Sequence, residues 1–321
     1  MQRVGLVLGA GGIVGQAWHA GVLQALSEQG FDPAASEVIV GTSAGSLVGG
    51  MLRRGVSVRE LGDGSYRRGQ VGGRLGRPNG AGLAATAERA VQAAARTSGR
   101  PRLGGRIAGM VPRGRVSPGG IVRLVQLVGG DEWPDETTWI CAVRRRTGVR
   151  VVFGSAGAPP APFSKAIAAS CAIPGYFEPV RIPTAPADAR QAGRRQQDDR
   201  PQDDYVDGGA HSPTNLDLLA DAGLDAVLAL SPMSFSGVPS ARLDLGARAL
   251  FRGTLAREAL AVRRRGTPVL TIAPGASELR VMGLNAMSPA RWADVVEIAA
   301  RAARRRLQGP EASSVLTRAL A

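Results

Sequence analysis

The side chain best placed to do chemistry is Ser43, which stands between Gly41 and Gly45 in a Gly-Thr-Ser-Ala-Gly run. The β-branched residues 38–40 precede this run, and apolar residues 47–48 follow it. At such a strand-to-helix turn a serine is held in a strained conformation that exposes its hydroxyl, and the start of the helix favours negative charge beside it. The pattern predicts a nucleophile at Ser43, against the plainer interpretation of a small-residue turn in a chain with 44 glycines.

A glycine-rich run at residues 9–12 follows the apolar residues 4–8 and permits two interpretations. A dinucleotide site needs Gly-x-Gly-x-x-Gly or Ala, with an acidic residue about 20 positions further on, at the end of the second strand. Here Val14 takes the last position of that pattern, and the second predicted strand ends at Gly41 without an acid.

The other interpretation of this run is an oxyanion hole. Glycine lets the backbone approach a reacting carbonyl, so the N–H groups of Gly11 and Gly12 could face the Ser43 turn. Two neighbouring parallel strands place their carboxyl ends at the same edge of a sheet, which brings both turns together. We therefore favour the oxyanion hole over the dinucleotide site.

A glycine turn at residues 208–209 also follows Asp207, which a short predicted strand delivers to this point. The chain has two histidines. His19 lies inside the first predicted helix, where a packed or partly exposed role is expected. His211 comes four residues after Asp207, so a triad of Ser43, His211 and an acid is one alternative, and a turn residue bonded to its own loop is the other.

The formal charge of +14 suggests either nucleic acid or an anionic membrane surface as a partner. Lys165 is the one lysine, so 39 of the 40 basic residues are arginine, and they are scattered without interleaved aromatic residues. This disfavours nucleic acid and leaves peripheral contact with an anionic membrane as the expectation. The two cysteines, Cys141 and Cys171, lie in apolar surroundings and are expected to be buried and reduced, as in the cytoplasm.

Predicted strands and helices alternate along the chain, which is typical of a three-layer α/β/α sandwich with a largely parallel sheet. With 44% hydrophobic but only 4% aromatic residues, the core must consist mainly of aliphatic side chains. An antiparallel hairpin is expected to turn at residues 147–148. Strands are predicted at residues 4–8, 38–40, 139–143, 149–153, 205–207, 226–230 and 269–272, and helices at residues 16–29, 83–95, 121–128, 163–172, 216–222, 241–264 and 289–306.

One domain is expected over residues 1–321, with three exceptions to its regular pattern. Residues 54–118 are rich in glycine and arginine and suit either a cap over a site or a tolerated surface excursion. Residues 188–204 are polar with almost no apolar side chain, which predicts a disordered insertion. Residues 307–321 are expected to form a C-terminal tail.

The order and spacing of these motifs resemble the patatin-like phospholipase family, in particular its bacterial acyl hydrolases, over residues 4–306. Three motifs carry the resemblance: Gly9-Ala10-Gly11-Gly12, Gly41-Thr42-Ser43-Ala44-Gly45 and Asp207-Gly208-Gly209. Residues 166–175, with Phe177 and Pro179, also look like the segment that the family places between its serine and aspartate motifs. The resemblance implies the layered α/β fold inferred above.

The family uses a Ser–Asp dyad, so the resemblance implies Ser43 as nucleophile and Asp207 as its base. A serine needs a base to lose its proton, and a carboxylate held away from water has a raised pKa that suits this task. The resemblance also implies an oxyanion hole from Gly11 and Gly12, joined by Ala10. The chain departs from the family at Val14, where members usually carry a lysine or arginine.

These observations predict a serine acyl hydrolase that cleaves lipid or other carboxylic esters, as a phospholipase A does, through an acyl-serine and without metal or cofactor. Two alternatives from other classes remain. The first is a nucleotide-binding oxidoreductase that uses the first glycine run, and the second is a catalytically silent binding module.

Overall fold

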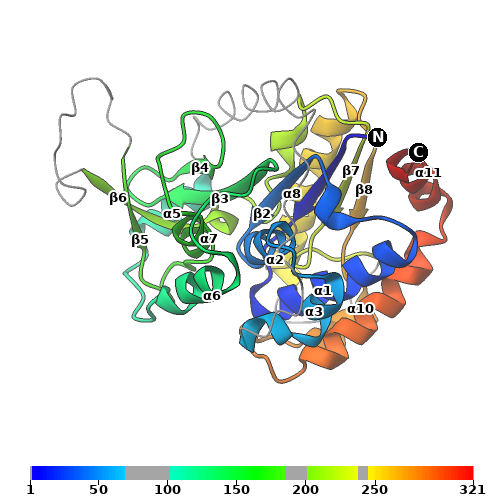
Figure 1. The fold of residues 1–321 in the computed structure, drawn as a ribbon, viewed down its shortest axis with the longest axis horizontal. Coiled ribbons are helices and arrows are strands. Elements are labelled where there is room, and N and C mark those ends of the chain that lie inside the picture. Colours follow the sequence, from blue (N-terminus) through cyan, green and yellow to red (C-terminus); the bar gives the residue numbers. More distant parts are fainter. Residues whose placement is uncertain (1, 69–101, 185–200, 238–244, 321) are drawn as a thin grey trace.

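The computed structural model describes residues 2–68, 102–184, 201–237 and 245–320. Within these residues, eight strands form one mixed sheet in the order β5-β6-β3-β2-β1-β7-β8, with β4 paired to β3 (Figure 1). The strands are β1 Val4–Leu8, β2 Val38–Thr42, β3 Thr138–Arg144, β4 Val149–Phe153, β5 Val180–Pro183, β6 Gln202–Asp207, β7 Ala226–Leu230 and β8 Val269–Ile272.

The centre of the sheet, from β3 to β8, is parallel, while β4, β5 and β6 pair antiparallel. Every residue of β1, β2 and β7 is buried, because helices cover both faces of the sheet there. Continuous apolar runs of this kind are typical of central parallel strands. The hairpin predicted at residues 147–148 is present between β3 and β4.

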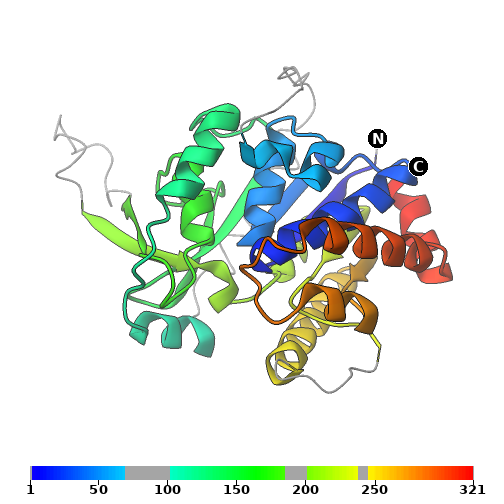
Figure 2. The same cartoon turned by 90° about the horizontal axis from the view of Figure 1, so that it is seen from below.

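Helices lie on both faces of the sheet, as Figure 2 shows for α2 and α8. Alternate strand residues face opposite layers: Leu6 and Leu8 pack with α1, α2 and α10, whereas Val7 and Val40 pack with α8. The predicted three-layer α/β sandwich is confirmed. The helices are α1 Gly12–Glu28, α2 Ala44–Arg53, α3 Val58–Asp63, α5 Leu103–Met110, α6 Gly119–Gly129, α7 Phe163–Ser170, α8 Leu245–Arg263, α9 Ala276–Met282, α10 Trp292–Leu307 and α11 Pro310–Leu320.

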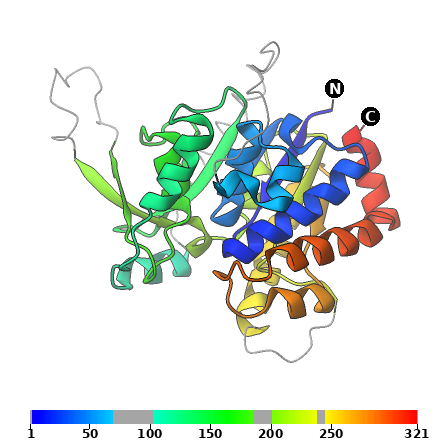
Figure 3. The same ribbon diagram turned by 60° about the horizontal axis from the view of Figure 1, so that its bottom comes forward.

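The helix α10 runs alongside α1 (Figure 3), and a glycine permits the close approach. A Cβ atom at Gly21 would clash with the backbone carbonyl of Val296.

Among the described residues, no helix combines the length and apolarity needed to cross a bilayer.

The strands β2 and β6, which are far apart in the chain, meet end to end along β3. Thr42, the last residue of β2, pairs with Cys141, and Asp207, the last residue of β6, pairs with Ala142. Strand β4 occupies the other edge of β3 at both positions, so β2 and β6 share one edge. The two strands run in opposite directions, and their carboxyl ends therefore meet.

Several predicted boundaries are wrong. Strand β6 includes residues 202–204, which the prediction assigned to the disordered insertion; arginines pair with Asp203 and Asp204, so the strand needs no apolar side chain there. Residues 216–222 form only a short 3-10 helix, Leu216–Leu219, and the predicted tail contains the packed helix α11. The predicted helix at 83–95 and most of the predicted cap and insertion lie outside the described residues.

Candidate active site

The structure places Ser43 at the turn between β2 and α2, with φ 53° and ψ −117°. This is a left-handed φ for a residue with a side chain, a conformation that costs about 1–3 kcal/mol and persists only where its surroundings enforce it. A Cβ atom on Gly45 would clash with the carbonyl oxygen of Leu8, and one on Gly41 would clash with the backbone of Ser46. Both glycines of the motif are therefore required by packing.

Hydrogen bonds hold the backbone of Ser43 in this conformation. Its N–H donates to Ser170 Oγ at 2.9 Å, and that hydroxyl donates to the Cys141 carbonyl at 2.6 Å. The Ser43 carbonyl accepts bonds from Ser46 Oγ at 2.7 Å and Cys171 Sγ at 3.2 Å. The sequence did not predict these roles, although Ser170 and Cys171 lie in the segment at residues 166–175 that the family resemblance marked.

Asp207 lies beside Ser43 because their strands end at neighbouring residues of β3. The Asp207 side chain accepts a hydrogen bond from the Gly209 N–H at 2.7 Å, and the neighbouring Ser43 side chain acts to lower the pKa of Asp207. A Cβ atom on Gly208 would clash with the Cys141 carbonyl, so the turn after Asp207 also requires its glycine.

Asp207 is only 5% exposed, and burial raises its pKa to about 6. The bonds from Ser43 and Gly209 act in the opposite direction but do not offset the burial. No ion pair to Asp207 occurs among the described residues. A carboxylate of this pKa can accept a proton near neutral pH, as a general base must.

The glycine-rich run fits an oxyanion hole only in part. The Ala10 N–H donates to the Pro213 carbonyl at 2.8 Å, so the prediction of Ala10 as a donor is wrong: its hydrogen bond holds the loop in place. Within the described chain, the N–H groups of Gly11 and Gly12 have no hydrogen-bond partner. Gly12, at φ 63°, lines the same cavity as Ser43.

That cavity has a volume of about 210 Å³ and is mainly apolar. Its walls come from α1, α2, α6, the segment after α7 and the loop before α10, including Ile13, Leu47, Ile121, Leu124, Phe177 and Met287. Such a lining suits an acyl chain, because hydrocarbon gains free energy on leaving water. Arg67 reaches the rim of the cavity, with its guanidinium stacked over the Trp292 ring.

The two histidines do not join Ser43 and Asp207. His19 Nε2 donates to the Gly9 carbonyl at 2.8 Å, and burial lowers the pKa of His19 to about 4. Burial, together with the charges of Arg150 and Arg102, lowers the pKa of His211 to about 3. Among the described residues, no hydrogen bond connects either histidine with Ser43 or Asp207.

A buried polar network lies next to the Asp207 turn, and its centre is Asn215 in a left-handed conformation, φ 53°. The Asn215 amide donates to Thr42 Oγ1 at 3.0 Å and to the Ser212 carbonyl at 2.7 Å. Arg150 donates to Asn215 Oδ1 at 3.0 Å. Thr42 directly precedes Ser43, and Ser212 follows the Asp207 turn. The Asn215 amide therefore links the segment that carries Ser43 to the segment that carries Asp207.

Carboxylates complete this network. Arg150, only 1% exposed, binds both oxygens of Asp217, at 2.8 and 2.9 Å. Glu258 from α8 accepts bonds from Thr214 Oγ1 at 2.7 Å and from Arg102 at 2.8 Å. No sequence motif marks these residues; the one local signal is a glutamate on the apolar face of α8.

Within the described residues, no group of three or more His, Cys, Asp or Glu side chains could hold a metal ion. Cys141 and Cys171 are both buried and free. Burial raises the pKa of each thiol to about 12, so neither is suited to act as a thiolate nucleophile.

A family model described as patatin-like phospholipase matches residues 6–220, more than half of the chain. Two solved structures are similar. VipD from Legionella pneumophila is 12% identical, with a TM-score of 0.43, over 98% of this chain and 67% of that one. The type III effector protein ExoU is 16% identical, with a TM-score of 0.41, over 97% of this chain and 54% of that one, so this chain spans about half of its length. No curated protein sequence matches the chain.

Proposed function

Since the chain belongs to the patatin-like phospholipase family, a family of lipid acyl hydrolases, we propose that Ser43 and Asp207 form a dyad that cleaves lipid carboxylic esters through an acyl-serine. The match to the family model confirms the resemblance inferred from the motifs. The observation that supports the dyad best is the junction on β3, where a strained serine lies beside a buried carboxylate that has no ion-pair partner among the described residues.

In the proposed first step, the Asp207 carboxylate accepts the Ser43 hydroxyl proton while Oγ attacks the ester carbonyl carbon. The carbonyl π electrons move onto oxygen, and the N–H groups of Gly11 and Gly12 stabilise that oxyanion. When the tetrahedral intermediate collapses, the C–O bond of the leaving alcohol breaks and the alkoxide takes the proton from Asp207. Water then attacks the acyl-serine in the same way, with Asp207 accepting its proton and returning it to Ser43 Oγ as the acyl bond breaks. This step releases the fatty acid and restores Ser43.

The pKa values favour Asp207 over His211 as the base. Asp207 has a pKa raised to about 6 by burial, whereas His211 has a pKa lowered to about 3 by burial and nearby arginines. The conjugate acid with the higher pKa belongs to the stronger base, so Asp207 accepts a proton more readily at neutral pH. Because Asp207 acts only when ionised, we expect hydrolysis to fall as the pH drops through about 6.

The structure offers little support for the alternative of a dinucleotide site at the first glycine run. The Val14 N–H at the start of α1 donates to the Ala286 carbonyl at 3.0 Å, and a Cβ atom on Gly12 would lie 2.6 Å from that same oxygen. A pyrophosphate needs several N–H groups of a helix start, and here the Ala286 carbonyl already takes the Val14 N–H among them. The family match also argues against an oxidoreductase.

Labelling with a fluorophosphonate probe tests the proposal and separates it from a silent binding module. We expect the wild-type protein and Ser314→Ala, a change at an exposed serine of α11, to be labelled equally. We expect Ser43→Ala to lose the label, and peptide mass spectrometry to find the adduct on Ser43 in the wild type. A folded wild-type protein without label, or a labelled Ser43→Ala variant, would contradict the proposal.

The substrate of such an enzyme lies in a lipid surface, and the charge of +14 favours an anionic one. Peripheral contact with an anionic membrane is therefore part of the proposal. So is a single domain over residues 1–321, which is supported by one sheet that contains strands from β1 to β8. The cytoplasmic location stays a prediction from the sequence.

A further inference from the structure

The helix α5 exposes three large apolar side chains along one face. Leu103, Ile107 and Met110 are 74%, 52% and 84% exposed, and their spacing of four and three residues places them on the same side of the helix. The opposite side packs on the protein: Ala108 is buried against Val143 and Val206 of the sheet. We call Leu103, Ile107 and Met110 the α5 apolar face.

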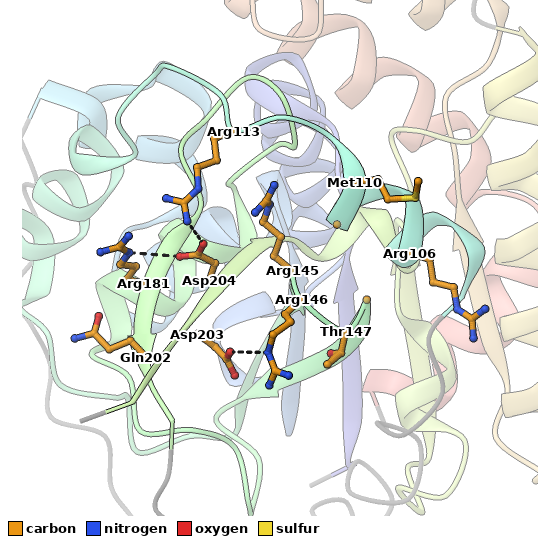
Figure 4. A pocket seen from close by; sticks show the side chains of 12 residues that line it. Arg106, Met110, Arg113, Arg145, Arg146, Thr147, Arg181, Gln202, Asp203 and Asp204 are labelled. Atoms are coloured by element: carbon orange, nitrogen blue, oxygen red, sulfur yellow. Dashed lines mark hydrogen bonds and ion pairs between the residues drawn. The ribbon is translucent and has the colours of Figure 1, made fainter. Parts of the chain in front are cut away.

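A groove of about 860 Å³ lies beside this face, between α5, the β3–β4 turn and the strands β5 and β6. Figure 4 shows its lining, in which arginines outnumber acidic residues five to two. The arginines are Arg106, Arg113, Arg145, Arg146 and Arg181, and we call this surface the arginine groove. The two acidic residues are Asp203 and Asp204.

The aspartates neutralise only part of the positive charge in the arginine groove. Asp204 is shared between Arg113 and Arg181, and Asp203 pairs with Arg146 at 3.5 Å. Arg146 and Arg181 remain 75% and 66% exposed. Within the described chain, Arg106 and Arg145 make no ion pair, and Arg145 donates to a backbone carbonyl instead. A net positive, water-exposed charge therefore remains.

The apolar face and the groove are one surface, because Arg106 and Met110 of α5 both line the groove. Apolar side chains next to arginines form the arrangement of a helix that lies at the interface of an anionic bilayer. We propose that the α5 apolar face and the arginine groove dock the protein on an anionic phospholipid membrane. The apolar side chains enter the boundary between headgroups and acyl chains, and the arginines bind the lipid phosphates.

This docking surface is joined to the candidate active site by two contacts. The backbone of α5 at Gly104 packs against the Ala210 carbonyl, in the turn directly after Asp207. Further along the same segment, Val116 pairs with Phe177, which lines the Ser43 cavity. Docking through α5 would therefore place the membrane beside the Asp207 turn and the apolar cavity. In this respect the inference rests on the proposed function.

The chemistry of the surface favours lipid over nucleic acid. Among the described residues that line the arginine groove, none has an aromatic side chain that could stack on a base, and the adjoining face is aliphatic. Binding to a phosphate backbone would leave three exposed aliphatic side chains in water, whereas a bilayer interface buries and stabilises them.

Flotation with phosphatidylcholine vesicles, with and without phosphatidylglycerol, tests the proposal at low and high salt. The tests use Ser43→Ala protein, so that no lipid is hydrolysed. We expect binding only to the anionic vesicles, weakened by salt. Arg106→Glu with Arg146→Glu should reduce the affinity by at least about 20-fold, since each basic residue near an anionic surface strengthens binding about five-fold. Ile107→Ser with Met110→Ser should reduce it as well.

The controls place two charge reversals and one apolar-to-serine change elsewhere on the surface: Arg264→Glu with Arg305→Glu, and Leu250→Ser, all at exposed positions. These controls should bind vesicles as the parent does. In an otherwise wild-type background, the α5 and groove variants should keep their melting temperature and their hydrolysis of a monomeric short-chain ester.

Equal binding to neutral and anionic vesicles, or equal losses in the control and groove variants, would overturn the docking surface. So would binding to a single-stranded RNA without binding to anionic vesicles. If the wild type is not labelled by a fluorophosphonate but vesicle binding follows the expected pattern, the proposed hydrolase fails and the docking surface stands.

Discussion

Asp207 and Asp217 lie in the same stretch of chain, and burial acts on both carboxyls in the same direction, yet their pKa values move apart. Burial raises the pKa of Asp207 to about 6, since only the Ser43 hydroxyl and the Gly209 N–H act against it. Burial alone would raise the pKa of Asp217 too, but the charge and hydrogen bonds of Arg150, together with the charge of Arg102, outweigh burial and hold that pKa below its usual range. A facing cation is the difference between the two.

This difference separates two uses of a buried carboxylate. Asp217 stays ionised to neutralise Arg150, which in turn holds Asn215 and the end of β2 in place. Asp207 keeps an affinity for protons near neutral pH, because burial destabilises its ionised form in the folded state. The comparison indicates that the Asp217 region stabilises the site, whereas the Asp207 region has the proton affinity that the proposed chemistry needs.

The largest expected effect concerns activity. We expect Asp207→Asn to lower kcat on the order of 1000-fold or more, because the asparagine cannot accept the Ser43 proton. His211→Ala should keep most of the activity, since His211 lies with the Arg150 group and has a pKa of about 3. Both variants can be assayed on a monomeric ester. An inactive His211→Ala with an active Asp207→Asn would establish the triad instead of the dyad.

The second expected effect concerns stability on the Asp217 side. Asp217→Asn should lower the free energy of unfolding by about 3–5 kcal/mol, because it leaves the buried Arg150 guanidinium without its counter-charge. Adding Arg150→Met should recover part of the loss, which urea unfolding of the single and double variants can measure. If the single variant is as stable as the wild type, the pair is not a structural ion pair.

The third expected effect is a gain in stability, opposite in sign to that of Asp217→Asn, and it concerns Asp207. Its pKa rises from 3.8 unfolded to about 6 folded, so the folded state binds more protons between these values, and the wild type loses stability as the pH rises through this window. Asp207→Asn has no such titration. We expect it to raise the free energy of unfolding at pH 7, by on the order of 2–3 kcal/mol.

Comparing the unfolding of wild type and Asp207→Asn at several pH values checks this expectation. The two should approach each other toward acid pH and separate toward neutral pH. A gap that is constant with pH would show that burial does not act on the charge of Asp207.

The smallest expected effect tests the link between the two regions. Asn215→Gly removes the amide that joins Thr42 and Ser212, and glycine accepts the left-handed φ without strain. We expect kcat to fall about 10-fold with KM unchanged, because Ser43 and Asp207 lose part of their alignment. Asn215→Ala should add backbone strain and lower stability further. An unchanged kcat in Asn215→Gly would show that β3 alone aligns the dyad.

The parts of the site that follow from local backbone demands were predictable from the sequence. The Ser43 turn needs small residues where other segments pass close to it, and Gly41 and Gly45 are both required by such contacts. The buried parallel strands were predictable from continuous apolar runs. The family could also be inferred, because its three motifs are short and ordered along the chain.

The errors have a common cause. Ala10 was predicted as an oxyanion donor, but the Pro213 carbonyl, which is distant in sequence, uses its N–H group. Residues 202–204 read as disordered because their composition is polar, yet arginines from other segments pair with them and complete β6. Composition and spacing indicate the local preferences of a residue. They do not indicate which hydrogen-bond or ion-pair partner from a distant segment the fold places beside it.

The sequence by itself determined that Ser43 occupies a strained turn in a layered α/β protein, because glycine spacing and apolar periodicity are local properties. Only the tertiary structure decided that Asp207 faces Ser43 while His211 and Asp217 face arginines. That outcome depends on β2 and β6 ending at adjacent residues of β3, and on which charges are buried together. Burial and pairing set the pKa of a carboxyl, and both are properties of the folded chain.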